Sequence, residues 1–350
     1  MAEITRVAAI GVNHWHALYD AAYLLMLKNM PDVEIVALQD DDESRARERV
    51  EKLAIADPAK APKVYTDYRR MLDETRPDFV LALGKPTDMA ATAHHLLDRG
   101  LPFVMEKPMG YNADEVRGIA DKARAVKGFA TVSLPYRFQP QTVMAQQLIN
   151  EGRLGTLSHI HIRQMRPTSA RYATWGAPWM LDPKIANGGC LRNLGPHGLD
   201  VFMLLTGSDA TVTGAQFSNR ALAQPVEDYA AVMLRAANGG NGSNGSNGVT
   251  GIVEVSNLHP NMSGLAEFCV SGDKGLFHVS GSVAKLITAD GEEPVKLVSK
   301  GQGSLLVLRE AITRWREGRP PFTSVDDCYR VVRLIDWAYA LGGGLGVVQA

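Results

Sequence analysis

Short apolar runs alternate with longer amphipathic stretches through the first part of the chain. The apolar runs lie at residues 6–10, 33–38, 78–83, 103–105 and 130–133, and helical stretches are expected after residue 16 to about 29 and at 43–53, 67–74, 88–99 and 112–126. Strands that are buried on both faces give such runs, and their alternation with helices predicts a right-handed, doubly wound parallel sheet. We therefore expect a first α/β domain over residues 1–134.

The pattern changes after a predicted helix at residues 140–151. Polar and apolar residues alternate at 157–163, as in a strand that is half buried in an antiparallel sheet. Similar runs follow at 212–217, 228–234, 251–255, 265–270 and 275–279, before a last amphipathic helix at about 326–341. These runs predict a second domain over 135–350 with a largely antiparallel sheet, and the last helix is expected to pack back on the first domain.

One stretch of the second domain has a composition of its own. Residues 238–248 contain only Gly, Asn and Ser and separate two of the predicted strands. Such a segment has no apolar side chain to bury, so we expect a flexible hairpin loop without chemistry.

Composition and charge argue against nucleic acid and membranes as partners and favour a cytoplasmic location. The chain has 350 residues, 45% of them hydrophobic, and a net charge of −1. No basic run indicates nucleic acid or a membrane surface, no apolar stretch is long enough to span a bilayer, and the first residues lack a signal-peptide core. Cys190, Cys269 and Cys328 are widely spaced, which predicts a reducing, cytoplasmic location and no zinc site. His159 and His161 share a strand face, and pleat alternation explains them better than a metal.

The turn after the first strand resembles a degraded nucleotide-binding loop. Of the GxGxxG fingerprint only Gly11 remains, with Asn13 and His16 at the other two glycine positions. Asn tolerates positive φ better than most residues, so we expect Asn13 to hold the turn and His16 to push the helix slightly from the strand.

Acidic residues follow the second strand, where a ribose-binding carboxylate is expected. Asp40 lies 24 residues after His16. The alternative is that these aspartates cap the next helix. Ribose binding and helix capping are both possible if Asp40 belongs to the strand end and Asp42 caps the helix.

Two opposite charges end the strand at 103–105. Glu106 and Lys107 precede Pro108, which has no N–H to extend the strand. Ligands of an open α/β sheet collect at the carboxyl edge, so this pair is a candidate for chemistry; a surface ion pair is the alternative.

A second group of candidates surrounds residue 197. Asn193 and His197 are four residues apart and share a face if the helix is continuous, whereas Pro196 either kinks that helix or begins it. A packing role for His197 is the alternative.

These motifs together resemble the Gfo/Idh/MocA family of oxidoreductases over essentially the whole chain. The resemblance is carried by Glu106-Lys107-Pro108, by Gly188-Gly189 with Gly195 and His197, by Arg137-Phe138, by Glu151-Gly152 with Gly155, and by Arg319-Pro320-Pro321. It implies a Rossmann domain, an α/β domain with an open antiparallel sheet used for oligomer contacts, and NAD(P)-dependent oxidation or reduction of a sugar, polyol or related hydroxy compound. Asn193 stands where the family commonly has Asp.

The resemblance also implies roles for individual residues. Lys107 is expected to hydrogen-bond the substrate oxygen, His197 to act as general base and Asn193 to orient its ring. The predicted cofactor contacts are Gly11, Val12, Asn13, His14, Trp15, Asp40, Asp41, Gly84, Pro86, Glu106 and Lys107. The predicted substrate contacts are Arg137, Trp175, Trp179, Arg192, Asn193 and His197; core packing is an equal alternative for the tryptophans.

Asp40 and Asp41 favour NAD over NADP, because a 2′-phosphate would meet their charges. Dual use is the alternative, with Arg45 or Arg47 swinging in. A homodimer or homotetramer through the second-domain sheet is expected. A nucleotide-binding sensor that has lost turnover is the competing function.

Overall fold

The computed structural model describes residues 4–236, 248–261 and 264–343. Two compact units make up the chain, and each is described by itself. The first contains residues 1–133, 172–179 and 304–329; the second contains 134–171, 180–303 and 330–350. Two later segments thus group with the first unit, although they follow the domain boundary expected at 134/135. The loop predicted at 238–248 lies outside the described residues except for Gly248.

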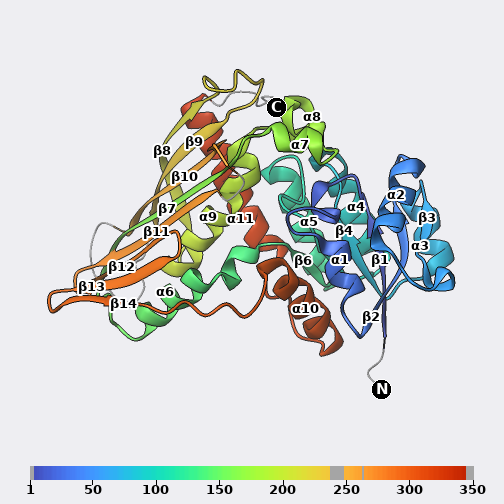
Figure 1. Cartoon of the computed structure of the whole chain (residues 1–350), viewed down its shortest axis with the longest axis horizontal. Helices are drawn as coiled ribbons and strands as arrows, with labels where there is room; N and C mark the ends of the chain where they lie inside the picture. Colours follow the sequence, from blue (N-terminus) through green and yellow to red (C-terminus); the bar gives the residue numbers. More distant parts are fainter. Residues whose placement is uncertain (1–3, 237–247, 262–263, 344–350) are drawn as a thin grey trace. The chain divides into compact units, whose positions relative to one another are not determined.

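The first unit is built on a six-stranded parallel sheet with the order β3-β2-β1-β4-β5-β6 (Figure 1). Its strands are β1 (Thr5–Ile10), β2 (Val33–Gln39), β3 (Lys63–Tyr65), β4 (Phe79–Ala82), β5 (Phe103–Met105) and β6 (Ala130–Val132). Strands β4, β5 and β6 are buried along their whole length, which explains their uninterrupted apolar sequences. The predicted parallel sheet is confirmed.

The helices of the first unit are α1 (Tyr23–Lys28), α2 (Glu43–Leu53), α3 (Tyr68–Thr75), α4 (Pro86–Asp98), α5 (Ala113–Val126) and α10 (Gly303–Arg316), with short 3-10 turns η1 (Trp15–Ala17) and η2 (Pro58–Lys60). Helices α2, α3 and α5 begin at side-chain caps that the sequence provides. Asp42 caps α2, accepting from the backbone N–H of Ser44 at 2.9 Å. Asn112 caps α5 in the same way through Glu115 at 3.0 Å. The cap predicted at Asp42 is confirmed.

The predicted helix after β1 is wrong in its extent. Only η1 follows the turn, and α1 begins at Tyr23, because Asp20 and Ala22 have positive φ and interrupt the helix between them. Within the turn at 11–16, positive φ falls on Gly11, so the expectation that Asn13 holds the turn through positive φ is wrong. A Cβ on Gly11 would lie 2.6 Å from the backbone of Gly84, so the first glycine is required by the close approach of two strand ends.

The second unit contains an eight-stranded sheet with the order β14-β13-β12-β11-β7-β10-β9-β8. Its strands are β7 (Leu157–Pro167), β8 (Ala210–Ser218), β9 (Tyr229–Ala236), β10 (Thr250–His259), β11 (Leu265–Gly272), β12 (Gly275–Ser280), β13 (Val283–Thr288) and β14 (Gly291–Pro294). All neighbours pair antiparallel except β7 and β10, which are parallel. The largely antiparallel sheet is therefore confirmed.

Helices cover one face of this sheet. In the second unit they are α6 (Pro140–Asn150), α8 (Pro183–Ala186), α9 (Cys190–Thr206) and most of α11 (Val325–Gly342), together with the 3-10 turn η3 (Pro135–Phe138); α7 (Ala170–Thr174) and η4 (Pro178–Leu181) cross the division between the units. Helices α6, α9 and α11 all lie on one side of the sheet (Figure 1). Among the described residues, no helix combines the length and the apolar character that crossing a bilayer requires.

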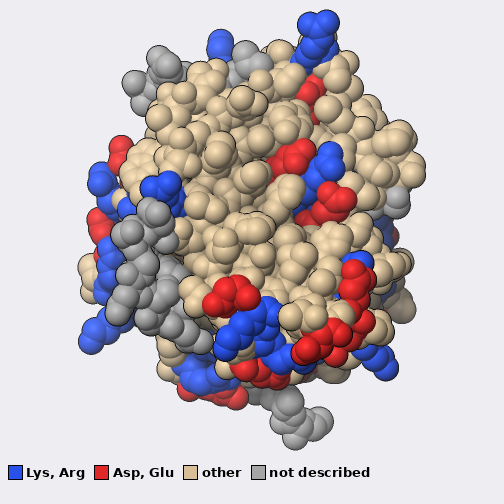
Figure 2. Space-filling view, turned by 90° about the vertical axis from the view of Figure 1, so that its left-hand side faces the viewer, with Lys and Arg blue, Asp and Glu red and all other residues tan. Residues whose placement is uncertain are grey.

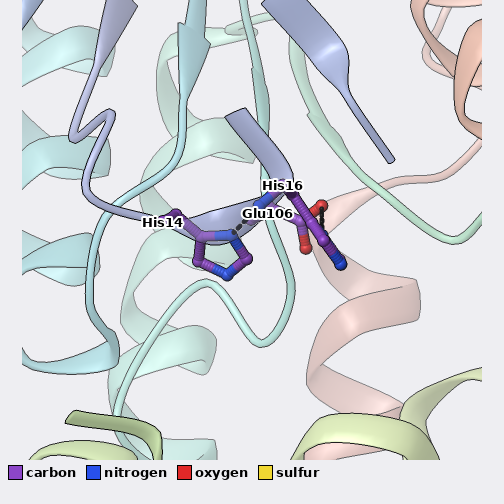
Figure 3. Close-up of side chains that lie close together, drawn as sticks. All are labelled: His14, His16 and Glu106. Carbon is purple, nitrogen blue, oxygen red and sulfur yellow. Dashed lines mark hydrogen bonds and ion pairs between the residues drawn. The ribbon is translucent and has the colours of Figure 1, made fainter. Parts of the chain in front are cut away.

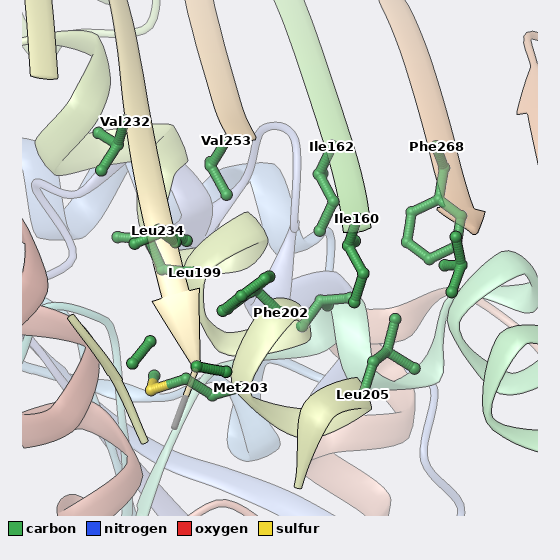
Figure 4. Close-up of a cluster of buried hydrophobic side chains, with 14 of the residues drawn as sticks. Ile160, Ile162, Leu199, Phe202, Met203, Leu205, Val232, Leu234, Val253 and Phe268 are labelled. Carbon is green, nitrogen blue, oxygen red and sulfur yellow. The ribbon is translucent and has the colours of Figure 1, made fainter. Parts of the chain in front are cut away.

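The core of the second unit lies between α9 and the sheet. Phe202 and Leu199 of α9 pack with Ile160, Ile162 and Val253 of the central strands (Figure 4).

Two glycines let α9 approach the sheet. A Cβ on Gly198 would lie 2.7 Å from Val253, and one on Gly251 would lie 2.3 Å from Phe202. The helix is consequently fixed close to the central strands.

Candidate functional site

Several of the residues predicted to bind a cofactor lie at one edge of the six-stranded sheet. The backbone N–H of Gly84, after β4, donates to Gly11 O, after β1, at 3.0 Å. The N–H of Glu106, after β5, donates to Ala82 O at 2.9 Å. Pro86 begins the helix that follows Gly84. The carboxyl ends of β1, β4 and β5 thus form a continuous edge, the usual place for a ligand on an open parallel sheet.

Asp40 contributes a buried carboxylate to this edge. Its Oδ1 accepts from an Arg45 Nη at 3.0 Å and from the backbone N–H of Asp42 at 3.1 Å. Its Oδ2 is buried and has no hydrogen-bond partner among the described residues. Burial raises the pKa of Asp40, against the opposing effects of the Asp42 N–H and Arg45. The unsatisfied oxygen suits a ribose hydroxyl, whereas Asp41 beside it is exposed.

A second buried acceptor lies in the turn after β1. The Oδ1 of Asn13 is also without a partner among the described residues, although the side chain is 3% exposed. Buried polar atoms are nearly always satisfied, so two such oxygens at one edge indicate that a ligand supplies the missing donors. A dinucleotide carries hydroxyl and amide groups that fit this need.

Aromatic side chains surround the same turn. Trp15 stacks on His14 with ring centroids 4.0 Å apart, and it contacts Tyr172 at 5.3 Å and Trp179 at 5.8 Å. The Trp175 ring stacks on Tyr19 at 6.1 Å. Both tryptophans predicted to contact substrate therefore pack within the first unit, and their role toward substrate stays a prediction.

Glu106 and His16 form a buried ion pair at the end of β5. The Nδ1 of His16 lies 2.9 Å from Glu106 Oε1 (Figure 3), and Glu106 Oε2 accepts from the backbone N–H of Lys107 at 3.1 Å. Burial by itself would raise the pKa of Glu106, but the charge and hydrogen bond of His16 lower it far below its ordinary value. Glu106 is thus held as a carboxylate.

Lys107 is 5% exposed beside this pair. Burial lowers the pKa of its ammonium, and Glu106 and Asp20 oppose that shift. A lysine whose charge is disfavoured at a ligand-binding edge suits hydrogen bonding to a substrate oxygen and proton exchange with it.

In the second unit, α9 presents Asn193 and His197. The helix starts at Cys190 and continues through Pro196, which resolves the alternative left open by the sequence: the two side chains share one face, one turn apart. The His197 ring stacks on Tyr136 with centroids 4.3 Å apart and planes 10° apart. This stacking fixes the plane of the imidazole.

Both arginines that were predicted to contact substrate have partners inside the second unit. Arg137 binds Asp200 through two hydrogen bonds of 2.8 and 2.6 Å. Arg192 lies 2.8 Å from Asp336 and donates to Asn187 O at 3.1 Å. These contacts give both arginines a structural role, and their contact with substrate stays a prediction.

The start of α9 is fixed by a carboxylate that sequence analysis missed. Glu227 accepts from the backbone N–H groups of Gly189 and Leu191 at 2.9 and 3.0 Å and from the Tyr339 hydroxyl at 2.7 Å. Burial raises the pKa of Glu227 to about 7, against these hydrogen bonds. No motif surrounds Glu227 in the sequence, so only the fold identifies it as the group that orients α9.

Two family models match the chain. An oxidoreductase family with an NAD-binding Rossmann fold matches residues 5–133, and the GFO/IDH/MocA C-terminal domain matches residues 142–278.

Two curated relatives match part of the chain. The rhizopine catabolism protein MocA of Rhizobium meliloti is 29% identical over 172 residues, which are 46% of this chain and 51% of that protein. The D-glucoside 3-dehydrogenase of Escherichia coli K12 is 26% identical over 205 residues, 59% and 55% of the two chains. The chain thus spans about half the length of the curated relatives it matches.

A solved structure matches nearly the whole fold. An oxidoreductase from Agrobacterium radiobacter, in complex with NAD+, L-tartaric acid and magnesium, superposes with a TM-score of 0.81 at 17% identity, covering 97% of this chain and 96% of that one. At this identity the likeness concerns the fold.

Proposed function

Since the chain belongs to the Gfo/Idh/MocA family of oxidoreductases, we propose that it transfers a hydride between NAD and a sugar, polyol or related hydroxy compound. The observation that carries the proposal is the shared sheet edge of Asp40 and Lys107, one with an unsatisfied acceptor and the other with a disfavoured charge. The same sheet edge therefore offers Asp40 to bind the cofactor and Lys107 to bind the substrate.

The chain's own groups divide the work of this reaction. When bound, the nicotinamide accepts or returns the hydride. Asp40 Oδ2 holds a ribose hydroxyl, and Asn13 Oδ1 accepts from a second cofactor group. Lys107 donates a hydrogen bond to the reacting oxygen. His197 takes the hydroxyl proton during oxidation, because an imidazole is poised near neutral pH. Asn193 holds the ring without supplying a negative charge.

Turnover is tested by mixing the protein with NAD+ and a panel of sugars and polyols while following the absorbance of reduced nicotinamide. A rise with one class of substrate supports the proposal. Tight NAD+ binding with no turnover across the panel contradicts it and favours the sensor.

Cofactor choice depends on Asp40. We expect Asp40→Ala to weaken NAD+ binding about 10- to 100-fold, the equivalent of roughly 1.5–3 kcal/mol for a lost hydrogen bond to a charged group. NADP+ binding should improve, since Arg45 is now held by Asp40 and would be released toward a 2′-phosphate. Titration of both cofactors measures the effect.

The matched control is Asp73→Ala, which removes an exposed carboxylate of α3. It should change either affinity by less than about 3-fold, as expected for a surface charge. An unchanged cofactor preference in Asp40→Ala contradicts the assignment.

Self-association is proposed through the outer face of the eight-stranded sheet. Met233 and Ile252 project from this face with 54% and 40% of their surface exposed. Viewed from the side where the sheet lies in Figure 1, uncharged surface fills much of the centre, interrupted by a group of acidic and basic side chains and bordered by more of them below (Figure 2). Large exposed apolar areas mark interaction sites, and a stable dimer buries about 1,200–2,000 Å².

We expect the double variant Met233→Lys/Ile252→Lys to dissociate the assembly, because two buried ammonium groups on each copy would face each other's apolar surface. Light scattering during size-exclusion chromatography measures the mass. Val126→Lys, on the exposed side of α5, is the control and should leave the mass unchanged. A double variant that keeps the wild-type oligomeric mass contradicts this interface.

A further inference from the structure

His16 occupies the last glycine position of the degraded fingerprint and lies between two carboxylates. Its Nδ1 is 2.9 Å from Glu106 Oε1, and its Nε2 is 3.7 Å from Asp20 Oδ2. The exposure of the three side chains rises from 2% at Glu106 through 12% at His16 to 38% at Asp20. A line of alternating charge therefore runs from the buried end of β5 to the surface.

The two carboxylates favour the doubly protonated imidazole. Burial by itself would lower the pKa of His16, but Glu106 and Asp20 raise it above the ordinary value. Each ring nitrogen then has an acceptor for its proton. The neighbouring His14 differs: burial and the charge of His16 lower its pKa well below the ordinary value. Its Nδ1 accepts the backbone N–H of His16 at 3.1 Å, so neutral His14 carries its proton on Nε2.

Glu106 joins this line to Lys107. One of its oxygens accepts from His16 and the other from the backbone N–H of Lys107. A carboxylate that already has a cation on one side gives a second cation less stabilisation, because the charge of the first repels it. Removing the charge of His16 would leave Glu106 to stabilise the Lys107 ammonium.

Tyr23 and Cys328 are further titratable groups near the His16–Glu106 pair, and both have hydrogen-bond partners. The Tyr23 hydroxyl is hydrogen-bonded to Ser133, and burial together with Glu106 raises the pKa of Tyr23 well above its ordinary value, so it stays neutral. The Cys328 thiol, beyond Lys107, donates to Pro108 O at 3.1 Å. Among the described residues, the titratable groups that act on the His16–Glu106 pair are thus Asp20, His14, Tyr23 and Lys107, with Cys328 behind Lys107.

We propose that His16 is a positioning residue for Lys107: held between Asp20 and Glu106, it fixes the Glu106 carboxylate and opposes a positive charge on the lysine. The consequence for catalysis rests on the proposed dehydrogenase function. An ammonium whose positive charge is opposed is a stronger proton donor, so His16 strengthens the hydrogen bond that Lys107 donates to the reacting oxygen.

The charge on Lys107 is measured without turnover. In protein labelled with ¹³C at lysine Cε, the Lys107 signal is assigned by its loss in Lys107→Met, and its chemical shift is followed with pH. We expect His16→Gln, which keeps a polar group beside Glu106 and removes the charge, to raise the midpoint by about one pH unit, or roughly 10-fold in the protonation equilibrium. His95→Gln is the matched control, because its ring packs edge-on against Tyr68 at 5.5 Å, away from the pair. It should not move the Lys107 midpoint.

A second measurement addresses His16 itself. Imidazole ¹⁵N shifts should show His16 doubly protonated above the ordinary histidine range, and Asp20→Asn should lower that midpoint. A Lys107 midpoint that is unchanged in His16→Gln, or a neutral His16 at pH 7, overturns the proposal. Stoichiometric zinc in the purified protein also overturns it, because a metal would take the nitrogen that bonds Glu106.

These outcomes are separate from the function test. If the midpoints move as expected and no substrate turns over, the positioning device stands and the dehydrogenase proposal fails. If turnover is found and the midpoints do not move, the dehydrogenase proposal stands and the positioning role of His16 fails. With both present, the alkaline limb of the kcat/KM profile, where the Lys107 donor loses its proton, should move up in His16→Gln together with the Lys107 midpoint.

Discussion

Lys107→Met is expected to slow hydride transfer by about 10²–10³-fold, the usual effect of removing one preorganised donor from a reacting oxygen. The methionine stem fills the same buried space, and the variant removes a charge that burial already disfavours. Folding should therefore be unaffected. Affinity for NAD+ should also be kept, because the ribose contact lies at Asp40, after β2. Single-turnover reduction of bound NAD+ measures the rate, and thermal unfolding checks the fold.

Lys60→Met, at an exposed lysine of the same unit, is the control and should react like the wild type. Wild-type turnover in Lys107→Met would show that the active site lies elsewhere. A loss of NAD+ binding in that variant would assign Lys107 to the cofactor instead of the substrate.

His197→Ala should lower the rate of oxidation about 10²–10⁴-fold near pH 7, because a positioned base is lost. The deficit should shrink as pH rises, since hydroxide can replace the missing base. The stack on Tyr136 is lost with the ring, so the unfolding temperature must be measured beside the pH–rate profile. His159→Ala, at an exposed strand position, should leave the profile unchanged.

A companion variant tests the role of residue 193 in the same experiment. Asn193→Asp would place a carboxylate on the His197 face of α9 and stabilise the imidazolium, so the rate should rise. A rate deficit in His197→Ala that persists unchanged to high pH would contradict the role of general base.

Hydrophobic periodicity predicted most of the fold because burial governs it. Strands buried on both faces gave continuous apolar runs, and strands with one covered face gave alternation, so both sheets could be expected. Helix α10 and the edge strands β13 and β14 were not predicted, although residues 303–316 carry an amphipathic pattern that indicates a helix. The parallel pairing of β7 with β10 joins strands far apart in sequence, and no local pattern encodes it.

The site was predictable where a strand end supplied its residues. Asp40 and Glu106 follow β2 and β5 directly, so topology alone brings them to one edge. The partnership of His16 with Glu106 spans 90 residues, and that of Glu227 with the start of α9 spans 38. Such contacts depend on tertiary packing and have no local signal. The interruption of the first helix at Asp20 and Ala22 was hidden for the same reason.

The first unit is assembled from three separate segments of the chain, so its fold cannot be completed during synthesis until the last segment has been made. Its last strand, β6, is completed by Thr323, whose carbonyl accepts the Val132 N–H at 3.1 Å. Trp315 packs on Phe79 with ring centroids 5.6 Å apart, and Trp15 packs on Tyr172 with ring centroids 5.3 Å apart. N-terminal domains usually fold first as the chain emerges. Here the six strands emerge within the first 133 residues but lack these partners until the segments at 172–179 and 304–329 have left the ribosome, so nucleotide binding has to wait for these later segments.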